Sequence, residues 1–202
     1  LLTGFARYLA LRFNVIDHPN HRSMHEVPVP RGGGMGIVII CTGFYAWLAW
    51  QKALPLHLCF ALSVPPLMVA IIGLIDDFGH VSRRLRLGTQ IGSAALGLLA
   101  IGSLPAIELP SGLWQPSNIL MPIALVAMVW LSNLYNFMDG INGLASLEAI
   151  FVLLAAAALC LINEALPWGF ILIVFAAAIA GFLPWNFPRA KIFMGDSGSG
   201  FL

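Results

Sequence analysis

The sequence predicts an all-α bundle of helices embedded in a membrane, on the basis of its composition and its long apolar segments. Of its 202 residues, 59% are hydrophobic and only 9% are charged, and the mean hydropathy is +0.89. A soluble domain of this length carries about 25% charged residues. No internal repeat or domain boundary is visible. We therefore expect one membrane-embedded domain over residues 1–202, truncated at both ends.

Apolar segments of about the length that a bilayer requires follow one another along the chain. The first segment, at 1–14, is expected to be the C-terminal part of a membrane span. A further apolar segment starts near 200–202. We expect seven spans in all, at 1–14, 34–50, 54–75, 88–104, 118–135, 144–162 and 166–183.

The charges of the connecting loops predict which loops share a side of the membrane. Seven of the eight loop Lys and Arg residues follow odd-numbered spans, and the positive-inside rule places those loops in the cytoplasm. These loops are 15–33, 76–87, 137–143 and 184–198. The same side holds all five aspartates of the chain: Asp17, Asp76, Asp77, Asp139 and Asp196. Because carboxylates contribute little to topology, their clustering indicates a shared cytoplasmic site.

The stretch WLSNLYNFMDGINGLAS, from Trp130 to Ser146, turns abruptly from apolar to polar. If the helix continues, Asn133, Asn136 and Gly140 share one face with Asp139 beside them. Carboxylate and carboxamide oxygens suit a hard cation and its phosphate ligands. The alternative is that these groups cap helices and satisfy a re-entrant turn.

Two adjacent carboxylates, Asp76 and Asp77, directly follow the third apolar segment. Two such carboxylates repel each other unless a cation, an arginine or a proton lies between them. A general base or a metal–phosphate site would use this pair. The alternative is neutralisation by the basic residues that follow, Arg83, Arg84 and Arg86.

The stretch FMGDSGSG, from Phe193 to Gly200, opens the last helix. Ser197, Ser199 and the free amides of a helix start would bind an anion, and Asp196 is a ligand for a hard cation. An ordinary helix cap is the alternative. The letters GDSG also occur around the nucleophile of serine proteases, but a context of membrane helices without a His–Asp partnership excludes that mechanism.

Other functions find little support in the sequence. The net charge of +1 gives no electrostatic basis for binding nucleic acid. The three cysteines lie inside apolar segments, where buried thiols are expected. Of the histidines near residue 20, only His21 and His25 have helical metal spacing, which is weak support for zinc.

Four motifs in order along the chain resemble the polyprenyl-phosphate N-acetylhexosamine-1-phosphate transferase family, glycosyltransferase family 4. The motifs are DHPNHRSMHEVPVPRGGG, GLIDDFG, NLYNFMDGINGLAS and NFPRAKIFMGDSGSGF. The family also contains phospho-MurNAc-pentapeptide transferase, and the first motif favours the O-antigen and common-antigen branch. A histidine-rich loop of the family is expected after residue 202.

The resemblance implies roles for individual residues. Asp76 and Asp77 match the catalytic aspartates that act on the lipid phosphate, and Asn136 and Asp196 match residues at a magnesium site. The expected substrate contacts are Asn133, Asp139, Gly140, Asn142, Asn186, Phe187, Ser197, His25 and Arg31. One departure is Asn142, because the family usually reads DGxDGL where this chain reads DGINGL.

The expected activity is the transfer of a sugar-1-phosphate from a UDP-N-acetylhexosamine, such as UDP-GlcNAc, to undecaprenyl phosphate with release of UMP. The cofactor would be Mg²⁺, with Mn²⁺ as a substitute. The expected setting is the bacterial inner membrane with the site on the cytoplasmic face, and a homodimer is a further option. The alternatives are another magnesium-dependent lipid phosphotransferase, or a transporter with a carboxylate cluster.

Overall fold

The structure is a computed structural model that describes residues 1–19, 27–104, 107–110, 112–114 and 117–202. Over these residues the helices are α1 Leu2–Arg12, α2 Met35–Trp50, α3 Leu56–Phe78, α4 Arg83–Ile101, α5 Ser117–Met138, α6 Leu144–Ile162, α7 Leu166–Asn186 and α8 Gly195–Ser199. The prediction of a helical protein is confirmed, with one addition. Two short antiparallel strand pairs lie in the loops, β1 Ile16–Asp17 with β2 Val29–Pro30, and β3 Ile107–Leu109 with β4 Gly112–Trp114.

Four of the described helices, α3, α5, α6 and α7, are long and apolar enough to cross a membrane. The other three expected spans, which correspond to α1, α2 and α4, form helices that do not meet this standard. Helix α1 has 11 residues, and α2 is apolar but has only 16. The structure therefore supports four of the seven expected spans.

Helix α4 begins at Arg83, five residues before the predicted start. Ser82 caps it, because its hydroxyl oxygen accepts a hydrogen bond from the Leu85 N–H at 3.3 Å. Hydrophobicity alone could not show this start, since the first turn is basic. The early start brings Arg86 into the helix, close to the end of α3.

Two other helices also extend beyond their apolar segments. Helix α3 continues through Phe78, so Asp76 and Asp77 occupy its last turn. Helix α5 continues to Met138, as proposed for the face that carries Asn133 and Asn136. The polar residues are thus held by regular backbone, which fixes their spacing better than a loop would.

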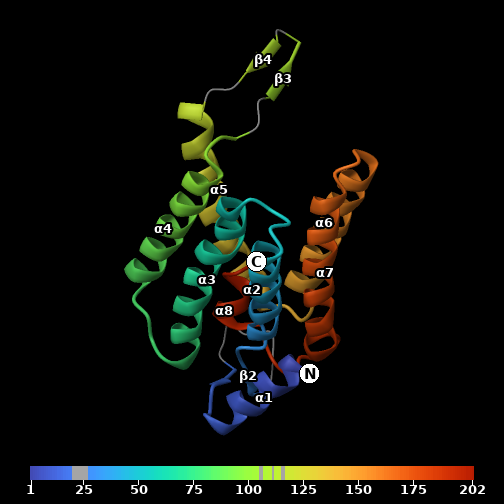
Figure 1. Ribbon diagram of the computed structural model, residues 1–202. Coiled ribbons are helices and arrows are strands. Elements are labelled where there is room, and N and C mark those ends of the chain that lie inside the picture. The colour runs from blue at the N-terminus through green and yellow to red at the C-terminus, as the bar shows by residue number, and fades with distance from the viewer. Residues whose placement is uncertain (20–26, 105–106, 111, 115–116) are drawn as a thin grey trace.

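The core lies where α2 and α7 meet the segment before α8 (Figure 1). Apolar side chains with no more than 1% exposure fill it: Ile37, Ile179, Phe182, Ile192 and Met194. Helix α8 lies between α3 and α2, and α5 also contacts it. Burial of Ile192 and Met194 therefore anchors the chain just before the short polar helix.

The four loops that were predicted to share one side meet at one end of the bundle. The main chain of 193–196 is hydrogen-bonded to Pro30, Asp77 and Asp139, which come from the other three loops or their borders. The β3–β4 hairpin and the α6–α7 connection lie at the opposite end (Figure 1). The predicted grouping of the loops is confirmed, whereas their compartment stays a prediction.

Glycines allow α8 to approach its neighbours closely. A Cβ atom at Gly73 of α3 would lie 2.2 Å from the main-chain oxygen of Asp196, and one at Gly34 would lie 2.3 Å from the Cα atom of Gly198. Both obstacles are main chain, which cannot move without displacing the helix. Contact between helices at this distance requires residues without side chains.

We predict that Gly73→Ala displaces α8 and destabilises the protein by about 1–3 kcal/mol, the usual cost of overpacking. The matched control is Gly92→Ala in α4, where an added Cβ would have no neighbour within 4 Å. Alanine is the better helix former, so the control should be neutral or slightly stabilising. Thermal unfolding of the purified protein in detergent measures both, and equal melting temperatures for the two variants would contradict the prediction.

Candidate active site

The site is built around the turn that leads into α8. The main chain before this turn is paired with the loop after β2: Phe193 N–H donates to Pro30 O at 2.8 Å, and Gly33 N–H donates to Phe193 O at 2.9 Å. Gly34 N–H donates to Met194 O at 2.9 Å. At Gly195 the backbone turns with φ +78°, a conformation that favours glycine.

Two aspartates from other helices hold this turn. Asp77 accepts hydrogen bonds from the N–H groups of Asp196 at 3.0 Å and Ser197 at 3.3 Å. Asp139, just after α5, accepts one from the Gly195 N–H at 3.0 Å. The carboxylates therefore cap the first turn of α8 from outside, in the way that an acidic residue stabilises a helix start.

This arrangement corrects the expectation that the free amides around Ser197 bind an anion such as phosphate. The anion that they bind is the carboxylate of Asp77. Ser197 is itself fully buried, so contact between its side chain and a ligand would require the turn to move. The sequence could not reveal this, because Asp77 and Ser197 lie 120 positions apart.

Arg86 joins the remaining carboxylates. Its Nη1 atom lies 2.8 Å from Asp76 Oδ2 and 2.6 Å from Asp196 Oδ2. The other oxygen of Asp76 accepts a hydrogen bond from the Val81 N–H at 2.8 Å. Neutralisation of the Asp76–Asp77 pair by the following basic residues was one of the two alternatives, and the structure shows it for Asp76, which Arg86 contacts, whereas Asp77 accepts hydrogen bonds from backbone N–H groups.

Two carboxylates of the site, Asp196 and Asp139, have pKa values well above the ordinary value for aspartate. The pKa of Asp196 is raised to about 6, mainly by burial and by its contact with Asp76, while the charge of Arg86 opposes the rise. The pKa of Asp139 is raised to about 7, mainly by burial and in part by the charges of Asp77 and Asp196, while hydrogen bonds from the N–H groups of Gly195 and Met194 oppose the rise. The site therefore carries more negative charge than its environment stabilises.

The predicted metal residues lie together. Asn136 and Asp196 line one small recess, which Arg86 also lines. In the described part of the chain, no three carboxylate, histidine or cysteine side chains converge to form a metal cage. Mg²⁺ does not need one, since it usually takes one or two carboxylates together with water and substrate phosphates. The hard oxygen donors of this recess fit such a cation.

Asn133, on the same helix face, is occupied by other protein groups. Its side-chain N–H₂ donates to Gln90 Oε1 at 2.9 Å and to the Val129 carbonyl at 2.8 Å. Gln90 in turn donates to Ser132 Oγ at 3.4 Å. Asn133 thus ties α5 to α4, and its predicted substrate contact stays a prediction.

The residues expected beside the nucleotide hold two loops together. Asn186 is 2% exposed; its Oδ1 accepts from the Gly143 N–H at 2.6 Å and its Nδ2 donates to the Ile192 carbonyl at 3.2 Å. Asn142 Nδ2 donates to the Pro188 carbonyl at 3.3 Å. These hydrogen bonds form without a ligand, so both asparagines stabilise the fold. Their contact with the sugar-nucleotide donor stays a prediction.

Of the other expected substrate contacts, two are exposed, one is in an ion pair and one lies outside the described residues. Phe187 and Gly140 are exposed at the site end of the bundle. Arg31 forms an ion pair with Asp17 at 2.6 Å, which links β1 to the end of β2. His25 lies outside the described residues.

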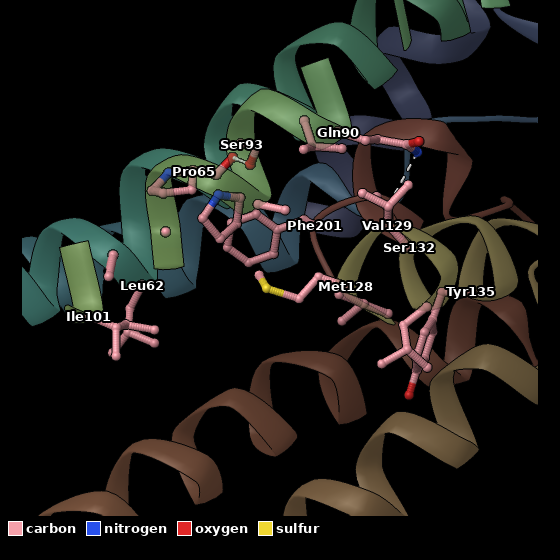
Figure 2. A pocket seen from close by; sticks show the side chains of 18 of the residues that line it. Leu62, Pro65, Gln90, Ser93, Ile101, Met128, Val129, Ser132, Tyr135 and Phe201 are labelled. Carbon is pink, nitrogen blue, oxygen red and sulfur yellow. Dashed lines mark hydrogen bonds between the residues drawn. The ribbon is translucent and has the colours of Figure 1, made fainter. Parts of the chain in front are cut away.

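An apolar cavity of about 580 Å³ runs between α3, α4, α5 and α7 and was not located from the sequence (Figure 2). Leu62, Ile101 and Met128 are among its apolar lining, and Gln90 and Ser132 form a polar edge. Tyr135 also lines it and donates its hydroxyl to Glu148 of α6. That contact explains the carboxylate of Glu148 near the start of α6.

The cavity adjoins the recess beside Asp196. Val69, Gln90 and Gly200 line both hollows. A molecule in the cavity would therefore have one end beside the carboxylates and the rest among apolar side chains. The helices of the bundle thus provide adjoining polar and apolar binding surfaces.

Residues 57–202 match the sequence model of glycosyl transferase family 4. The chain is 36% identical to the decaprenyl-phosphate N-acetylglucosaminephosphotransferase of Mycolicibacterium smegmatis, over 98% of this chain and 53% of that protein. It is 26% identical to a probable undecaprenyl-phosphate N-acetylglucosaminyl 1-phosphate transferase of Bacillus subtilis, over 100% and 56%. It is 29% identical to a phospho-N-acetylmuramoyl-pentapeptide-transferase of Lactococcus lactis, over 91% and 58%. The chain thus spans about half the length of the curated relatives it matches, and the resemblance inferred from the motifs is confirmed.

We predict that Asp139→Asn stabilises the protein without divalent cations, and more at pH 8 than at pH 5. Because its pKa is about 7 when folded and 3.8 in its ordinary state, the wild type loses stability as the pH rises between these values. Asparagine keeps an oxygen acceptor for the Gly195 N–H and cannot ionise. Melting temperatures at both pH values measure the effect, at about 2–4 °C for each kcal/mol. An equal difference at the two pH values would show that burial of Asp139 has no electrostatic cost.

Proposed function

The chain belongs to glycosyl transferase family 4, and from this premise we propose that its protein transfers a sugar-1-phosphate to a polyprenyl phosphate. The acceptor in the proposal is undecaprenyl phosphate, and the donor is a UDP-N-acetylhexosamine such as UDP-GlcNAc. The curated relatives named above support the polyprenyl phosphate acceptor and the N-acetylglucosamine phosphate group. The observation that carries the proposal is the junction of a carboxylate cluster with an apolar cavity.

The cavity suits the acceptor lipid. A polyprenyl chain is apolar along its length and anionic at one end, and the cavity is mostly apolar where it lies away from Gln90 and Ser132. With the phosphate at the junction lined by Val69 and Gly200, the prenyl units would extend along α3 and α4. Burial of each CH₂ group contributes about 0.8 kcal/mol, so even part of such a chain binds firmly.

The donor would approach from the end of the bundle where the loops meet. Asp139, Asn142 and Phe187 border that end, and in this proposal they would contact the nucleotide. In the reaction, an oxygen of the lipid phosphate attacks the phosphorus next to the sugar, and the bond from that phosphorus to the bridging oxygen breaks. UMP leaves, and the sugar-1-phosphate becomes part of a lipid-linked diphosphate.

The polar residues at the ends of α3, α5 and α8 each have a role in the proposed reaction. Mg²⁺, held by Asp196 and Asn136, would neutralise charge on the diphosphate. Asp76 or Asp77 would keep the lipid phosphate deprotonated, or form a covalent intermediate. Both carboxylates already accept hydrogen bonds at fixed positions, which orients them for either role. Arg86 lies close enough to offer further N–H donors to a phosphate.

We also propose the bacterial inner membrane as the location, with the site facing the cytoplasm. The loop charges support that orientation. A first membrane step in O-antigen or cell-envelope polysaccharide synthesis fits this donor and acceptor.

We predict that Asp196→Asn in the full-length protein reduces turnover more than about 10²-fold, because it removes the charge of a proposed metal ligand. Membranes are supplied with undecaprenyl phosphate, Mg²⁺ and UDP-GlcNAc, and both UMP and lipid-linked product are measured. The control is Glu164→Gln, which removes a carboxylate from the connection at the opposite end of the bundle. Near-normal turnover of Asp196→Asn would exclude it as a ligand, and wild-type protein inactive with all UDP-N-acetylhexosamines would contradict the proposed function.

We predict that Gly97→Leu raises the KM for undecaprenyl phosphate at least several-fold and leaves the KM for the UDP-sugar unchanged. Gly97 lines the cavity, and a Cβ there would meet Pro65 at an ordinary 3.7 Å, so a side chain can start at this position and a longer one would occupy cavity volume. Gly92→Leu on the same helix is the control, since its Cβ would have no neighbour within 4 Å. A change in the KM of the donor alone would place the lipid elsewhere.

A further inference from the structure

The side chain of Arg86 occupies the position between carboxylates where a cation would be expected. A single nitrogen, Nη1, lies within hydrogen-bonding distance of Asp76 Oδ2 and Asp196 Oδ2. These two aspartates come from different elements, the last turn of α3 and the first turn of α8. Arg86 thereby joins two helix ends that negative charge would otherwise push apart.

The recess next to this ion pair has little free space. It is lined by Asn136, Asp196 and Arg86, and its volume is about 10 Å³. One water molecule requires about 10–15 Å³ measured in this way, so a cation that retains several waters does not fit while Arg86 is in place. The same oxygen of Asp196, Oδ2, is already engaged by the guanidinium at 2.6 Å.

The other charged groups of the cluster do not join Asp76 to Asp196. Asp77 and Asp139 accept hydrogen bonds from backbone N–H groups of the α8 turn. Arg31 is paired with Asp17, although its charge also interacts with Asp77 and Asp196. In the part of the chain that the structure describes, Arg86 is the cation in direct contact with Asp196.

We propose that Arg86 is a built-in counter-ion that competes with the divalent cation for Asp196 and must leave it before the cation binds. The inference rests on the proposed function, which assigns Asp196 and Asn136 to the metal. Without a divalent cation, the guanidinium offsets part of the charge of Asp76 and Asp196. When a cation binds, its charge would replace that of Arg86 at Asp196.

The geometry allows this exchange. The side chain of Arg86 is 29% exposed, so solvent is available in the direction away from the recess. Its contact with Asp76 can persist, and the guanidinium has five N–H donors in a planar fork that matches a phosphate. Release from Asp196 would therefore free donors for an anionic substrate at the moment when the metal is in place.

The test measures Mn²⁺ binding to the full-length protein in detergent, without substrates, by the loss of the free-ion signal in electron paramagnetic resonance. Arg86→Met removes the charge and keeps the length of the side chain, and we expect it to bind Mn²⁺ about tenfold more tightly than the wild type. Arg86→Lys keeps a competing charge and should bind with nearly wild-type affinity. Arg84→Met is the matched control, because Arg84 is exposed on the same helix, and it should leave the affinity unchanged.

Thermal unfolding gives a second measurement that does not depend on activity. Arg86→Met should have a lower melting temperature than the wild type without divalent cations and should gain more from adding Mn²⁺. Arg86→Met protein with unchanged or weaker Mn²⁺ affinity would overturn the inference, as would equal effects of Arg86→Met and Arg86→Lys.

Asp196→Asn distinguishes this failure from failure of the proposed metal site. If Asp196→Asn abolishes Mn²⁺ binding and Arg86→Met does not strengthen it, the site is right and the competition is wrong. If Asp196→Asn leaves Mn²⁺ binding at wild-type affinity, the metal site of the proposed function fails, and the inference fails with it.

Discussion

The hydrogen bonds between Asp77 and the first turn of α8 are the contact on which the site depends. They join the end of α3 to a turn that lies 119 positions further along the chain. Glycine at position 73 permits the approach, since any side chain there would meet the main chain of Asp196. Because Asp139 holds the same turn from α5, three separate elements share one rigid junction. The positions of the other polar groups follow from it.

This junction concentrates negative charge, and the surrounding structure compensates it in two ways. Backbone N–H groups stabilise Asp77 and Asp139, whereas a guanidinium stabilises Asp76 and Asp196. The two kinds of hydrogen-bond donor differ in mobility. Amides belong to the backbone and remain in place, but an arginine side chain is flexible and partly exposed. Of the four carboxylates, Asp196 is therefore the one that could exchange Arg86 for the proposed cation, while Asp76 keeps its arginine.

Much of this organisation could be predicted from the sequence. Apolar segments and loop charges indicated the helical bundle and the common side of the four polar loops, because both depend on local composition. The partners of the polar groups were not predictable, since they join distant positions. The sequence indicated an open anion site at the amides of the α8 turn, whereas in the structure these amides donate hydrogen bonds to Asp77. Similarly, nothing in the sequence indicated that Asn186 is hydrogen-bonded to Gly143 and Ile192 and so holds two loops together.

A substrate with a charged head and a long apolar tail imposes opposing requirements, since its two parts are stable in different solvents. The structure meets both by placing the ends of α3 and α5 beside the carboxylates while the same helices continue as walls of the apolar cavity. Val69 and Gly200 mark the boundary, because each lines both hollows. A helix that crosses a membrane passes from a polar to an apolar environment within a few turns. In the proposed reaction, a site at the helix ends would therefore bring the lipid phosphate to a water-soluble donor without drawing the lipid tail into water.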